Sequence, residues 1–461
     1  MTAVAVAQLE EAHVGRSTTL SPRRWWPLLA GLPAAAVSLA WAASKPLPMI
    51  DDWSWIAGAR RGSGFVWSSR PGEALLHWLV FWASGTHPVP PLVVLALLNV
   101  GVGALMWAFA SRHWGPRVAT LAALAWAVLP NRGATRMWAS CIPNLAAGAL
   151  VLAAIVVADR ERTTPRRAAA VIALAAGACL TYEGADALAA AAVVLATIHA
   201  TSRRSRVATA VGGGVVLGAC TAWVARHTPK TGRVHVLANA SRLASTQFGI
   251  GLWPGRVAVL GVVMLAVIIL AFAAPVLGRD RFPEEWAITV GVLGMALGAS
   301  VFMVTGFPLA DAGLFDRGNV FTDIGTSLVI GAMLALAWRY RLAAGAAVSA
   351  AVLLLLASGN VAPVKGFARS ATDARSVLND VRTLPEYPSS PFAIGPLPNH
   401  DGVAGFTAAY DIVAAIQARY GVIEDARVTG TDAQAEALVG KEAVYRYCPA
   451  TRALVAWRSR C

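Results

Sequence analysis

Two adjacent carboxylates, Asp51 and Asp52, lie in the stretch KPLPMIDDWSWIAGARRGSGFVWSSRP, which covers residues 45–71. They follow the first long apolar block of the chain and precede several tryptophans and arginines. Paired carboxylates in such a place can act as a general base toward a hydroxyl group, or they can coordinate a divalent cation. The alternative is structural, because Asp is a good helix N-cap and DDWSW would open a helix well. Both roles depend on the elements that hold the pair.

The composition indicates a polytopic membrane protein. Hydrophobic residues make up 57% of the 461 positions and charged residues 14%, whereas soluble domains carry roughly 25% charged residues. The apolar residues form blocks that reach or approach the length of about 20 residues that a helix needs to cross the hydrocarbon core. We therefore expect an all-α membrane fold with about eleven transmembrane helices. The blocks cover residues 26–44, 90–110, 116–130, 142–158, 168–182, 185–200, 207–224, 257–277, 286–305, 319–337 and 342–360.

The charges between the blocks predict the orientation in the plasma membrane. If the N-terminal tail, residues 1–25, is cytoplasmic, then every second connection is too, and each of these is short and basic, as the positive-inside rule requires. An odd number of crossings then places the C-terminus outside the cytoplasm. The net charge of +14 is explained by topology and anionic lipid. No clear basic soluble domain indicates nucleic acid, and no small-residue cleavage site indicates a removed signal peptide.

Two outer loops of the transmembrane domain, residues 26–360, stand out. The first, residues 45–89, contains a short apolar segment with Trp78 and Trp82 on one helical face, which favours a helix lying on the outer surface. The second, residues 226–256, is more basic than the positive-inside rule expects for that side. This excess of positive charge suggests that the second loop receives an anion.

The composition changes after about residue 360, and residues 361–461 are expected to form a small extracytoplasmic α/β domain. ARSATDARSVLNDVRTL and FTAAYDIVAAIQARYG predict helices, whereas PFAIGPLP, EAVYRYC and RALVAWRS predict strands. Cys448 and Cys461 close a short loop in this region. They predict a disulfide if the domain lies outside the cytoplasm, and two free thiols otherwise.

The order of these features resembles the GT-C class of membrane glycosyltransferases, which take sugars from polyprenyl-phosphate carriers on the outer membrane face. In both, a first span leads into a long outer loop with an acidic pair near its start and interfacial helices after it. MIDDW matches the loop-one Asp/Glu motif of that class in position and character. The resemblance covers most of the architecture and implies that Asp51 or Asp52 is the catalytic base, without deciding between them. SSRP and TYEG are also similar to uncharacterised actinobacterial members.

The resemblance implies three kinds of partner: the lipid bilayer, a polyprenyl-phosphate-linked sugar, and an acceptor glycan, lipid or protein. Arginine suits the carrier phosphate because its planar fork donates two hydrogen bonds. The alternative for each basic residue is headgroup contact or pairing with a local acid, such as Asp316 beside Arg317. The candidates on the predicted outer side are Arg70, Arg132, Arg136, His227, Lys230, Arg233 and Arg317.

Tyr182 and Glu183 end a predicted span on the outer side. An acid at a membrane boundary is costly unless it is solvated or paired. Glu183 therefore either holds a hydroxyl group of the sugar or faces water. With Tyr182, it completes the set of substrate-binding candidates.

Three functions remain open on the sequence, besides a non-catalytic membrane scaffold. The first is a membrane glycosyltransferase of the GT-C type, with a divalent cation as a candidate cofactor. The second is a transporter or flippase for a lipid-linked or anionic solute, but such proteins place ionisable groups mid-membrane, where Asp323 is one exception among nearly uncharged segments. The third is a polysaccharide polymerase or ligase, although residues 226–256 are mid-chain and of moderate length. No Walker, GxGxxG, HExxH or CxxC motif is present.

Overall fold

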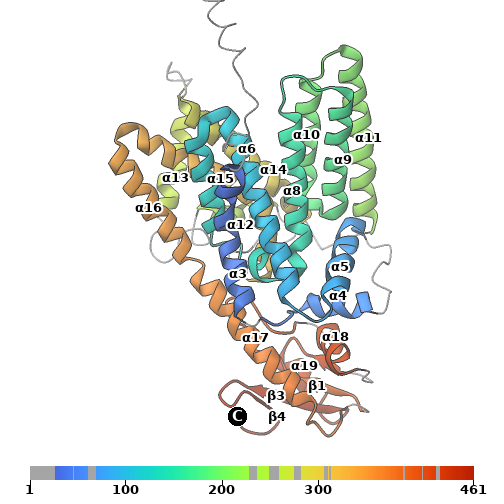
Figure 1. Ribbon diagram of the computed structural model, residues 1–461. Helices are drawn as coiled ribbons and strands as arrows, with labels where there is room; N and C mark the ends of the chain where they lie inside the picture. The colour runs from blue at the N-terminus through green and yellow to red at the C-terminus, as the bar shows by residue number, and fades with distance from the viewer. Residues whose placement is uncertain are drawn as a thin grey trace, which may run out of the picture.

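The computed structural model describes residues 26–44, 46–60, 69–227, 236–248, 259–274, 282–305, 310, 313–387, 390–407, 409–421 and 426–461. Within these residues the chain is mostly helical. Figure 1 shows the helices gathered in an upright bundle, with a small sheet-containing domain at one end that holds the C-terminus.

Among the described residues, seven helical stretches are long and apolar enough to cross a membrane. The protein is thus an all-α multi-pass membrane protein with a small C-terminal α/β domain, as predicted. The seven stretches are Trp26–Ala43, Val89–Val128, Ala139–Ala158, Arg203–His227, Pro283–Val304, Asp316–Tyr340 and Leu342–Val381.

The eleven predicted blocks exceed these seven stretches for two reasons. The 40-residue helix α6 (Val89–Val128) is two helices joined at Gly115, where φ is 84°. Trp107 Nε1 donates to Thr120 Oγ1 at 3.1 Å, so the two halves fold back on each other. Three further blocks fall on short helices of 17, 13 and 15 residues. These are α9 (Pro165–Thr181), α10 (Asp186–Ile198) and α13 (Val259–Ala273).

The bundle contains further helical elements in addition to these. The first span consists of α2 (Trp26–Gly31), η2 (Leu32–Ala35) and α3 (Ala36–Ala43). The remaining elements are α4 (Asp51–Arg60), α5 (Pro71–Ser84), α7 (Ala134–Met137), η3 (Ala139–Cys141), α8 (Ile142–Ala158), η4 (Glu183–Ala185), α11 (Arg203–His227), α12 (Val236–Phe248), α14 (Pro283–Thr305), η5 (Leu314–Gly318), α15 (Asn319–Tyr340) and α16 (Leu342–Ser358).

Helix α15 occupies the centre of the bundle and is its most buried span. Its neighbour α14 approaches so closely that a Cβ added at Gly298 would lie 2.4 Å from the carbonyl oxygen of Phe321. Small residues permit this kind of backbone contact between membrane helices. The close packing fixes the start of α15, which directly follows η5 and its residue Arg317.

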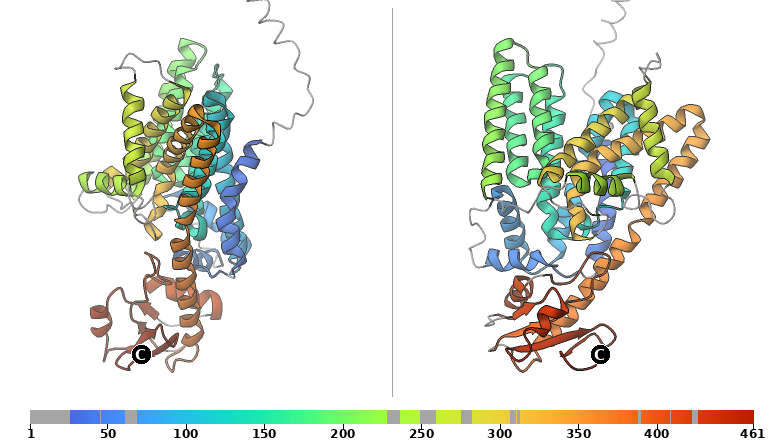
Figure 2. Two further views of the ribbon diagram at one scale, coloured as in Figure 1. Left: turned by 90° about the vertical axis from the view of Figure 1, so that its left-hand side faces the viewer. Right: turned by 180° about the vertical axis from the view of Figure 1, so that it is seen from behind.

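The predicted surface helix corresponds to α5, which is not among the helices long enough to cross a membrane. In both views of the bundle, α5 stands roughly along the bundle beneath α9 and α11, while α4 runs across at its foot (Figures 1 and 2). The N-terminus of α5 meets the end of α9, because a Cβ at Gly72 would lie 2.4 Å from Thr181 Oγ1. Trp78 and Trp82 do stack on one face, with ring centroids 6.0 Å apart. The start of α5 is therefore fixed against α9, while Trp82 stays 66% exposed.

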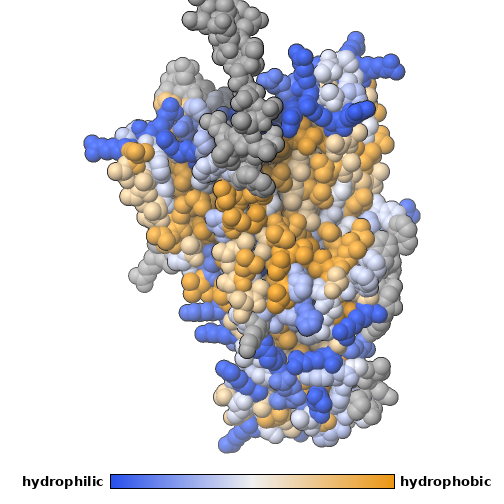
Figure 3. All heavy atoms as spheres, viewed as in Figure 1, coloured by the Kyte–Doolittle hydropathy of each residue, from blue (hydrophilic) through white to orange (hydrophobic). Residues whose placement is uncertain are grey.

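The outer surface of the helical part carries a belt of hydrophobic residues between hydrophilic ends (Figure 3). Large apolar side chains on several helices are exposed there, among them Leu97, Val215, Val262 and Leu354. Such a belt is the surface expected where lipid replaces water as the solvent. Most of the C-terminal domain lies beyond the belt, at one hydrophilic end (Figure 3).

The C-terminal domain is built on α17 (Val361–Val381), which continues from α16 away from the bundle (Figure 2). Its four-stranded sheet has the order β2-β1-β3-β4, with β1 parallel to β2 and β3, and with β3 antiparallel to β4. The predicted helices and strands are all present. The elements are β1 (Phe392–Ile394), α18 (Ala409–Tyr420), β2 (Ala426–Val428), α19 (Asp432–Glu436), β3 (Ala443–Cys448) and β4 (Ala453–Ala456).

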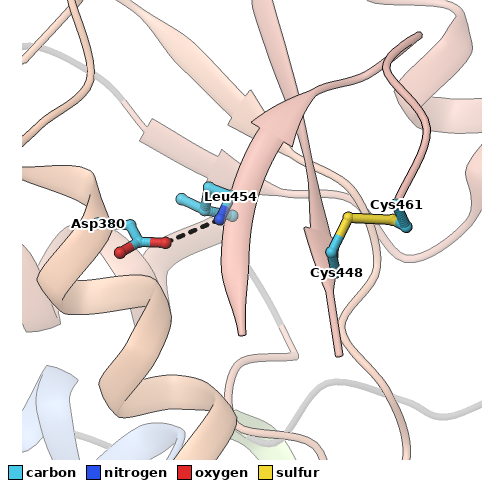
Figure 4. Close-up of a disulfide and its surroundings, with 4 residues drawn as sticks. All are labelled: Asp380, Cys448, Leu454 and Cys461. Atoms are coloured by element: carbon cyan, nitrogen blue, oxygen red, sulfur yellow. Dashed lines mark hydrogen bonds between the residues drawn. A yellow bond between two sulfur atoms is a disulfide. The ribbon is translucent and has the colours of Figure 1, made fainter. Parts of the chain in front are cut away.

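A disulfide joins Cys448, at the end of β3, to Cys461, the last residue (Figure 4). On the other side of the hairpin, the backbone N–H of Leu454 donates to Asp380 of α17 at 2.8 Å (Figure 4). These two links tie the chain end and the edge strand β4 to the rest of the domain.

Candidate functional site

A cavity of about 330 Å³ opens where α4, α5, α8 and η5 meet near the C-terminal domain. Segments that are far apart in sequence therefore contribute to one wall. Four of the predicted site residues line it, together with four that were not predicted as site residues. The lining residues are Asp51, Ser54, Trp55, Arg70, Glu73, Asn144, Tyr182 and Arg317.

The two adjacent carboxylates have different positions. Asp51 lines the cavity, whereas Asp52 is only 3% exposed and bonds to its surroundings. One oxygen of Asp52 accepts from the backbone N–H of Met49 at 3.0 Å. The other accepts from the N–H and hydroxyl of Ser140, at 2.8 and 2.6 Å. Asp52 thus fastens the start of α4 to η3.

These contacts explain why α4 begins at the acidic pair. Ile50 has a positive φ of 47°, which turns the chain sharply into the helix, and Asp52 caps the turn by binding Met49. Of the two carboxylates, Asp52 therefore has the capping role considered from sequence, because it accepts a hydrogen bond from the backbone N–H of Met49 just before the helix. Burial raises the pKa of Asp52 to about 7, although the hydrogen bonds from Met49 and Ser140 act in the opposite direction.

Arg317 lies on the cavity wall with Asp51. Its guanidinium stacks 5.2 Å from the ring centroid of Trp138, and the charges of Asp51 and Glu73 act on it. Trp138 is held in turn by a 3.2 Å hydrogen bond from its Nε1 to the carbonyl oxygen of Met49. One tryptophan thereby connects the Asp51 turn to the Arg317 segment.

Arg70 also lines the cavity, at the start of α5, and contacts several side chains there. It pairs with Glu73 at 3.1 Å and also with Glu183, and it lies 4.6 Å from the ring centroid of Tyr182. Burial lowers the pKa of Arg70, but the charges of Glu73 and Glu183 and the proximity of Tyr182 together raise it above its usual value. Arg70 is therefore a permanent cation. We refer to Asp51, Arg70, Glu73, Glu183 and Arg317 as the cavity cluster.

Tyr182 and Glu183 occupy the turn after α9. Tyr182 is buried and stacks on Phe321 of α15, with ring centroids 5.8 Å apart. Glu183 does not line the cavity directly, and its pairing with Arg70 is the paired state that an acid at a membrane boundary needs. Glu183 is thus paired with Arg70 rather than facing water alone, and its role toward a sugar hydroxyl stays a prediction.

Arg132 and Arg136 are placed elsewhere, fully buried inside the bundle. Arg132 lies 3.6 Å from Asp323 and 3.4 Å from the ring centroid of Trp126. Arg136 donates to the carbonyl oxygens of Trp126 and Ala127, at 3.2 and 2.9 Å. Both arginines therefore close the end of α6, which explains why they do not line the cavity.

Asp316 and Asp323 complete this second group of charges. Asp316 accepts a hydrogen bond from the backbone N–H of Ala134 at 3.0 Å, and its charge acts on both arginines. We refer to Arg132, Arg136, Asp316 and Asp323 as the interior cluster.

The basic outer loop contributes little that the structure describes. His227 is exposed at the end of α11, where its ring lies 4.3 Å from that of Trp223, and it does not line the cavity. Lys230 and Arg233 lie outside the described residues. The same stretch contains α12, which runs across the bundle (Figure 2). Gln247 of α12 accepts from Thr326 of α15 at 2.5 Å.

Several site residues were missed from sequence. Ser54 follows Asp51 by three positions, so one helical turn places both on the same face, and this spacing could have identified it. Glu73 stands three positions after Arg70 in the same way. Asn144 carried no such signal, because one polar residue near the start of an apolar span has many possible roles.

His77 lies behind the cavity wall and was also missed. It is fully buried, its ring is 4.2 Å from that of Trp55, and its Nε2 is 3.2 Å from the carbonyl oxygen of Ser140. Burial lowers the pKa of His77 to about 3. The ring is therefore neutral and holds Trp55 in place rather than transferring a proton at neutral pH.

The divalent cation considered from sequence would need a set of ligands. Among the described residues, no group of three or more His, Cys, Asp or Glu side chains could hold a metal ion. In the part of the chain that the structure describes, Asp51 and Glu73 are the carboxylates on the cavity wall.

No protein-family model matches this sequence, and no curated protein sequence matches it either. Among solved structures, the chain is similar to an archaeal oligosaccharyltransferase, AglB from Archaeoglobus fulgidus, in complex with an inhibitory peptide and a dolichol-phosphate. The identity is 11% and the TM-score 0.46, over 89% of this chain and 65% of that one. This chain thus spans about two thirds of the length of the archaeal enzyme.

A second similar structure is ArnT from Cupriavidus metallidurans bound to undecaprenyl phosphate, at 14% identity and a TM-score of 0.40, over 94% of this chain and 97% of that one. The same enzyme in its apo state has 16% identity and a TM-score of 0.36. The structures similar to this chain therefore include an oligosaccharyltransferase and ArnT, all at low sequence identity.

Proposed function

We propose that the chain is a membrane glycosyltransferase that transfers a sugar from a polyprenyl-phosphate carrier to an acceptor on the outer membrane face. One observation carries the proposal: Asp51 and Arg317, a base and a phosphate-binding group from opposite ends of the bundle's sequence, line the same cavity. Acid–base chemistry and phosphate binding are the two requirements of this reaction. The cavity lies between α4, α5, α8 and η5, and α4 in turn contacts the C-terminal domain through Arg60.

Asp51 is the general base in this mechanism. It takes the proton of an acceptor hydroxyl as the hydroxyl oxygen bonds to the anomeric carbon of the donor sugar. The bond between that carbon and the carrier phosphate oxygen breaks in the same step, and the phosphate leaves with the electron pair. Direct displacement inverts the configuration at the anomeric carbon. Asp52 keeps α4 in place and does not contact the substrates.

The two cavity arginines have separate roles. Arg317 stabilises the charge that develops on the leaving phosphate, because a guanidinium donates two hydrogen bonds to phosphate oxygens. Arg70 already pairs with Glu73 and Glu183, so it orients Glu73 on the wall and offsets the acids near the phosphate. Trp55 offers an aromatic face to the sugar ring.

We also propose on which side of the membrane each part of the chain lies. Residues 1–25 are cytoplasmic, residues 26–360 form the transmembrane domain, and residues 361–461 lie outside the cytoplasm together with the cavity. The Cys448–Cys461 disulfide supports this side, because disulfides persist in oxidising compartments. Reporter fusions after residue 461 test it, and activity of a cytoplasm-dependent reporter would contradict it.

The decisive experiment compares Asp51→Asn with the wild type in a transfer assay with synthetic polyprenyl-phosphate sugars. Loss of the base should lower the rate by about 10²–10⁴-fold, while expression and thermal stability remain unchanged. Glu161→Gln is the matched control, because Glu161 is an exposed acid in a loop of the opposite end. Retained transfer in Asp51→Asn would remove the proposed mechanism.

A further inference from the structure

The wall of the cavity that α8 forms contains a polar group without a described partner. Asn144 is 2% exposed and lines the cavity, yet within the described ranges its Nδ2 has no hydrogen-bond acceptor. Ser54, on the neighbouring wall from α4, shares this property: its Oγ is buried and has no hydrogen-bond partner among the described residues. Two neutral polar groups therefore face the same space.

The other buried asparagines of the described bundle differ from Asn144. Buried polar groups are nearly always hydrogen-bonded, because an unmade bond costs free energy in a low-dielectric interior. In the described part of the chain, five further asparagines are buried, and the Nδ2 of each donates to a carbonyl or carboxylate oxygen. They are Asn99, Asn131, Asn239, Asn319 and Asn360. Asn144 differs from them in lining the cavity.

The surrounding groups restrict what Asn144 can bind. Its amide N–H donates, whereas ionised Asp51 and Glu73 only accept hydrogen bonds. A ligand that satisfies the wall must therefore accept on one side and donate on the other, which a hydroxyl group does. A phosphate in this place would only accept and would meet the carboxylates.

The charge of the wall restricts the ligand further. Asn144 and Ser54 carry no charge, so their part of the lining offers no counter-ion to a charged ring. Arg70 already pairs with Glu73 on the lining and with Glu183 behind it. Trp55 adds an aromatic face, held by His77 at a ring distance of 4.2 Å.

We infer that Asn144 and Ser54 form a subsite for the hydroxyl groups of a neutral monosaccharide unit, with Asn144 as its specificity-determining residue. The inference names the substrate class of the transfer reaction and therefore rests on the proposed function. Arg317 also lines the cavity and takes the phosphate. Sugar and phosphate therefore contact different lining residues.

Binding of simple glycosides to the full chain in lipid nanodiscs tests the subsite. The probes are neutral methyl glycosides, a methyl 2-amino-2-deoxyglycoside and inorganic phosphate, each titrated by saturation-transfer NMR. At least one neutral glycoside should bind in preference to the amino glycoside. Asn144→Ala should raise its Kd about tenfold, and Ser54→Ala should raise it by roughly threefold, as expected for one neutral hydrogen bond. Equal Kd values in wild type and Asn144→Ala, or a preference for the amino glycoside, would overturn the inference.

Two further variants separate binding from folding. Asn144→Asp keeps the shape and replaces the N–H donor by an acceptor, so it should weaken binding at least as much as Asn144→Ala. Asn379→Ala is the matched control, because Asn379 is exposed on α17, and its Kd should equal that of the wild type. The Tm of ligand-free Asn144→Ala should not fall, since no described group loses a bond. A fall as large as that of Asn99→Ala would make Asn144 structural and overturn the inference.

The experiment also distinguishes the subsite from the proposed function. Asp51→Asn should lose transfer but retain glycoside binding that depends on Asn144. If Asp51→Asn transfers normally, the proposed function fails whatever the glycosides do. If transfer depends on Asp51 but glycoside binding ignores Asn144, the subsite alone fails.

Discussion

The cavity cluster and the interior cluster use the same residue types in different surroundings. Each joins arginines to carboxylates from distant segments, and each includes an arginine beside an aromatic ring. The arginine side chains differ in exposure: Arg70 retains 19% of its side-chain surface, whereas Arg132 retains none. The interior cluster is enclosed by the bundle, and the cavity cluster has one side open to a ligand.

The partners of the arginines explain this difference. In the interior cluster, Arg136 donates to the last carbonyl oxygens of α6, which no residue of the helix itself can satisfy. Within the membrane such groups need an internal donor. In the cavity cluster, Arg70 pairs with the side chains of Glu73 and Glu183 and lies beside the ring of Tyr182. Arg136 therefore completes the end of a helix, whereas Arg70 holds acidic side chains beside a cavity.

The largest expected effect concerns the interior cluster. Arg132→Leu leaves Asp323 buried beside one cation fewer and removes a donor from Asn99. Breaking a buried ion pair from one side typically costs about 3–5 kcal/mol, so the variant should lose much of its folded fraction. Thermal unfolding in nanodiscs measures the effect, with Arg317→Leu as the comparison. Equal losses of stability in the two variants would contradict the division into two clusters.

The sequence predicted the interior arginines and the cavity arginines as one set, and the reason is physical. Both kinds stand near the ends of apolar blocks, on the same predicted side of the membrane. Whether a side chain points to a helix end or to a cavity depends on how the helices pack, and hydropathy does not contain that information. The helical membrane fold, the C-terminal strands and the location of the acidic pair were accessible because they depend on local periodicity and charge. The different positions of Asp51 and Asp52 depend on Ser140, a contact between distant segments.

The second prediction concerns Asp52, which holds the start of α4 next to Asp51 but is buried like the interior cluster. Its pKa of about 7 exceeds the usual 3.8 because of burial, a difference that corresponds to about 4 kcal/mol. Since the folded state binds the proton more tightly, this stability is fully present below about pH 4 and is lost as the pH rises through 7.

Melting temperatures measured between pH 4 and pH 8 test the linkage. The wild type should become less stable over this range relative to Asp52→Asn, whose amide does not titrate. Asp159→Asn provides a control for general pH effects, because Asp159 lies at the opposite end of the bundle beside His113. Parallel pH profiles of wild type and Asp52→Asn would show that Asp52 is ionised in the folded protein throughout.

The third prediction concerns Arg317 and the chemistry of the cavity cluster. Arg317→Gln removes the guanidinium from the leaving phosphate and should lower kcat/KM by about 10²-fold, near 2.7 kcal/mol. Arg317→Lys should recover part of the loss, because it keeps the charge without the bidentate fork. The matched control is Arg339→Gln at the other end of α15, where Arg339 pairs with Glu284 at 2.8 Å. If Arg339→Gln loses as much activity as Arg317→Gln, the effect comes from the helix and not from the cavity.

The smallest effect concerns how the cavity cluster is held from outside the bundle. Arg60, at the end of α4, donates to the carbonyl oxygen of Ala418 in α18 at 2.6 Å. The same domain also touches the segment that leads to Arg317, since a Cβ at Gly313 would lie 2.6 Å from the carbonyl oxygen of Gly402. The helix that carries Asp51 and the segment that leads to Arg317 therefore both contact the C-terminal domain.

Arg60→Ala should cost only about 1 kcal/mol of stability, because Arg60 is exposed, but it should lower kcat by a few-fold, because α4 carries Asp51 at its other end. Arg60→Lys should restore most of kcat, and Arg419→Ala should leave it unchanged, since Arg419 bonds only weakly to Asn379 within the domain, at 3.4 Å.

Arg60→Ala should also leave the interior cluster intact, so that the stability difference between Arg132→Leu and the wild type is the same in either background. Coupling between Arg60 and Arg132 would mean that the C-terminal domain holds the whole bundle and not the cavity alone.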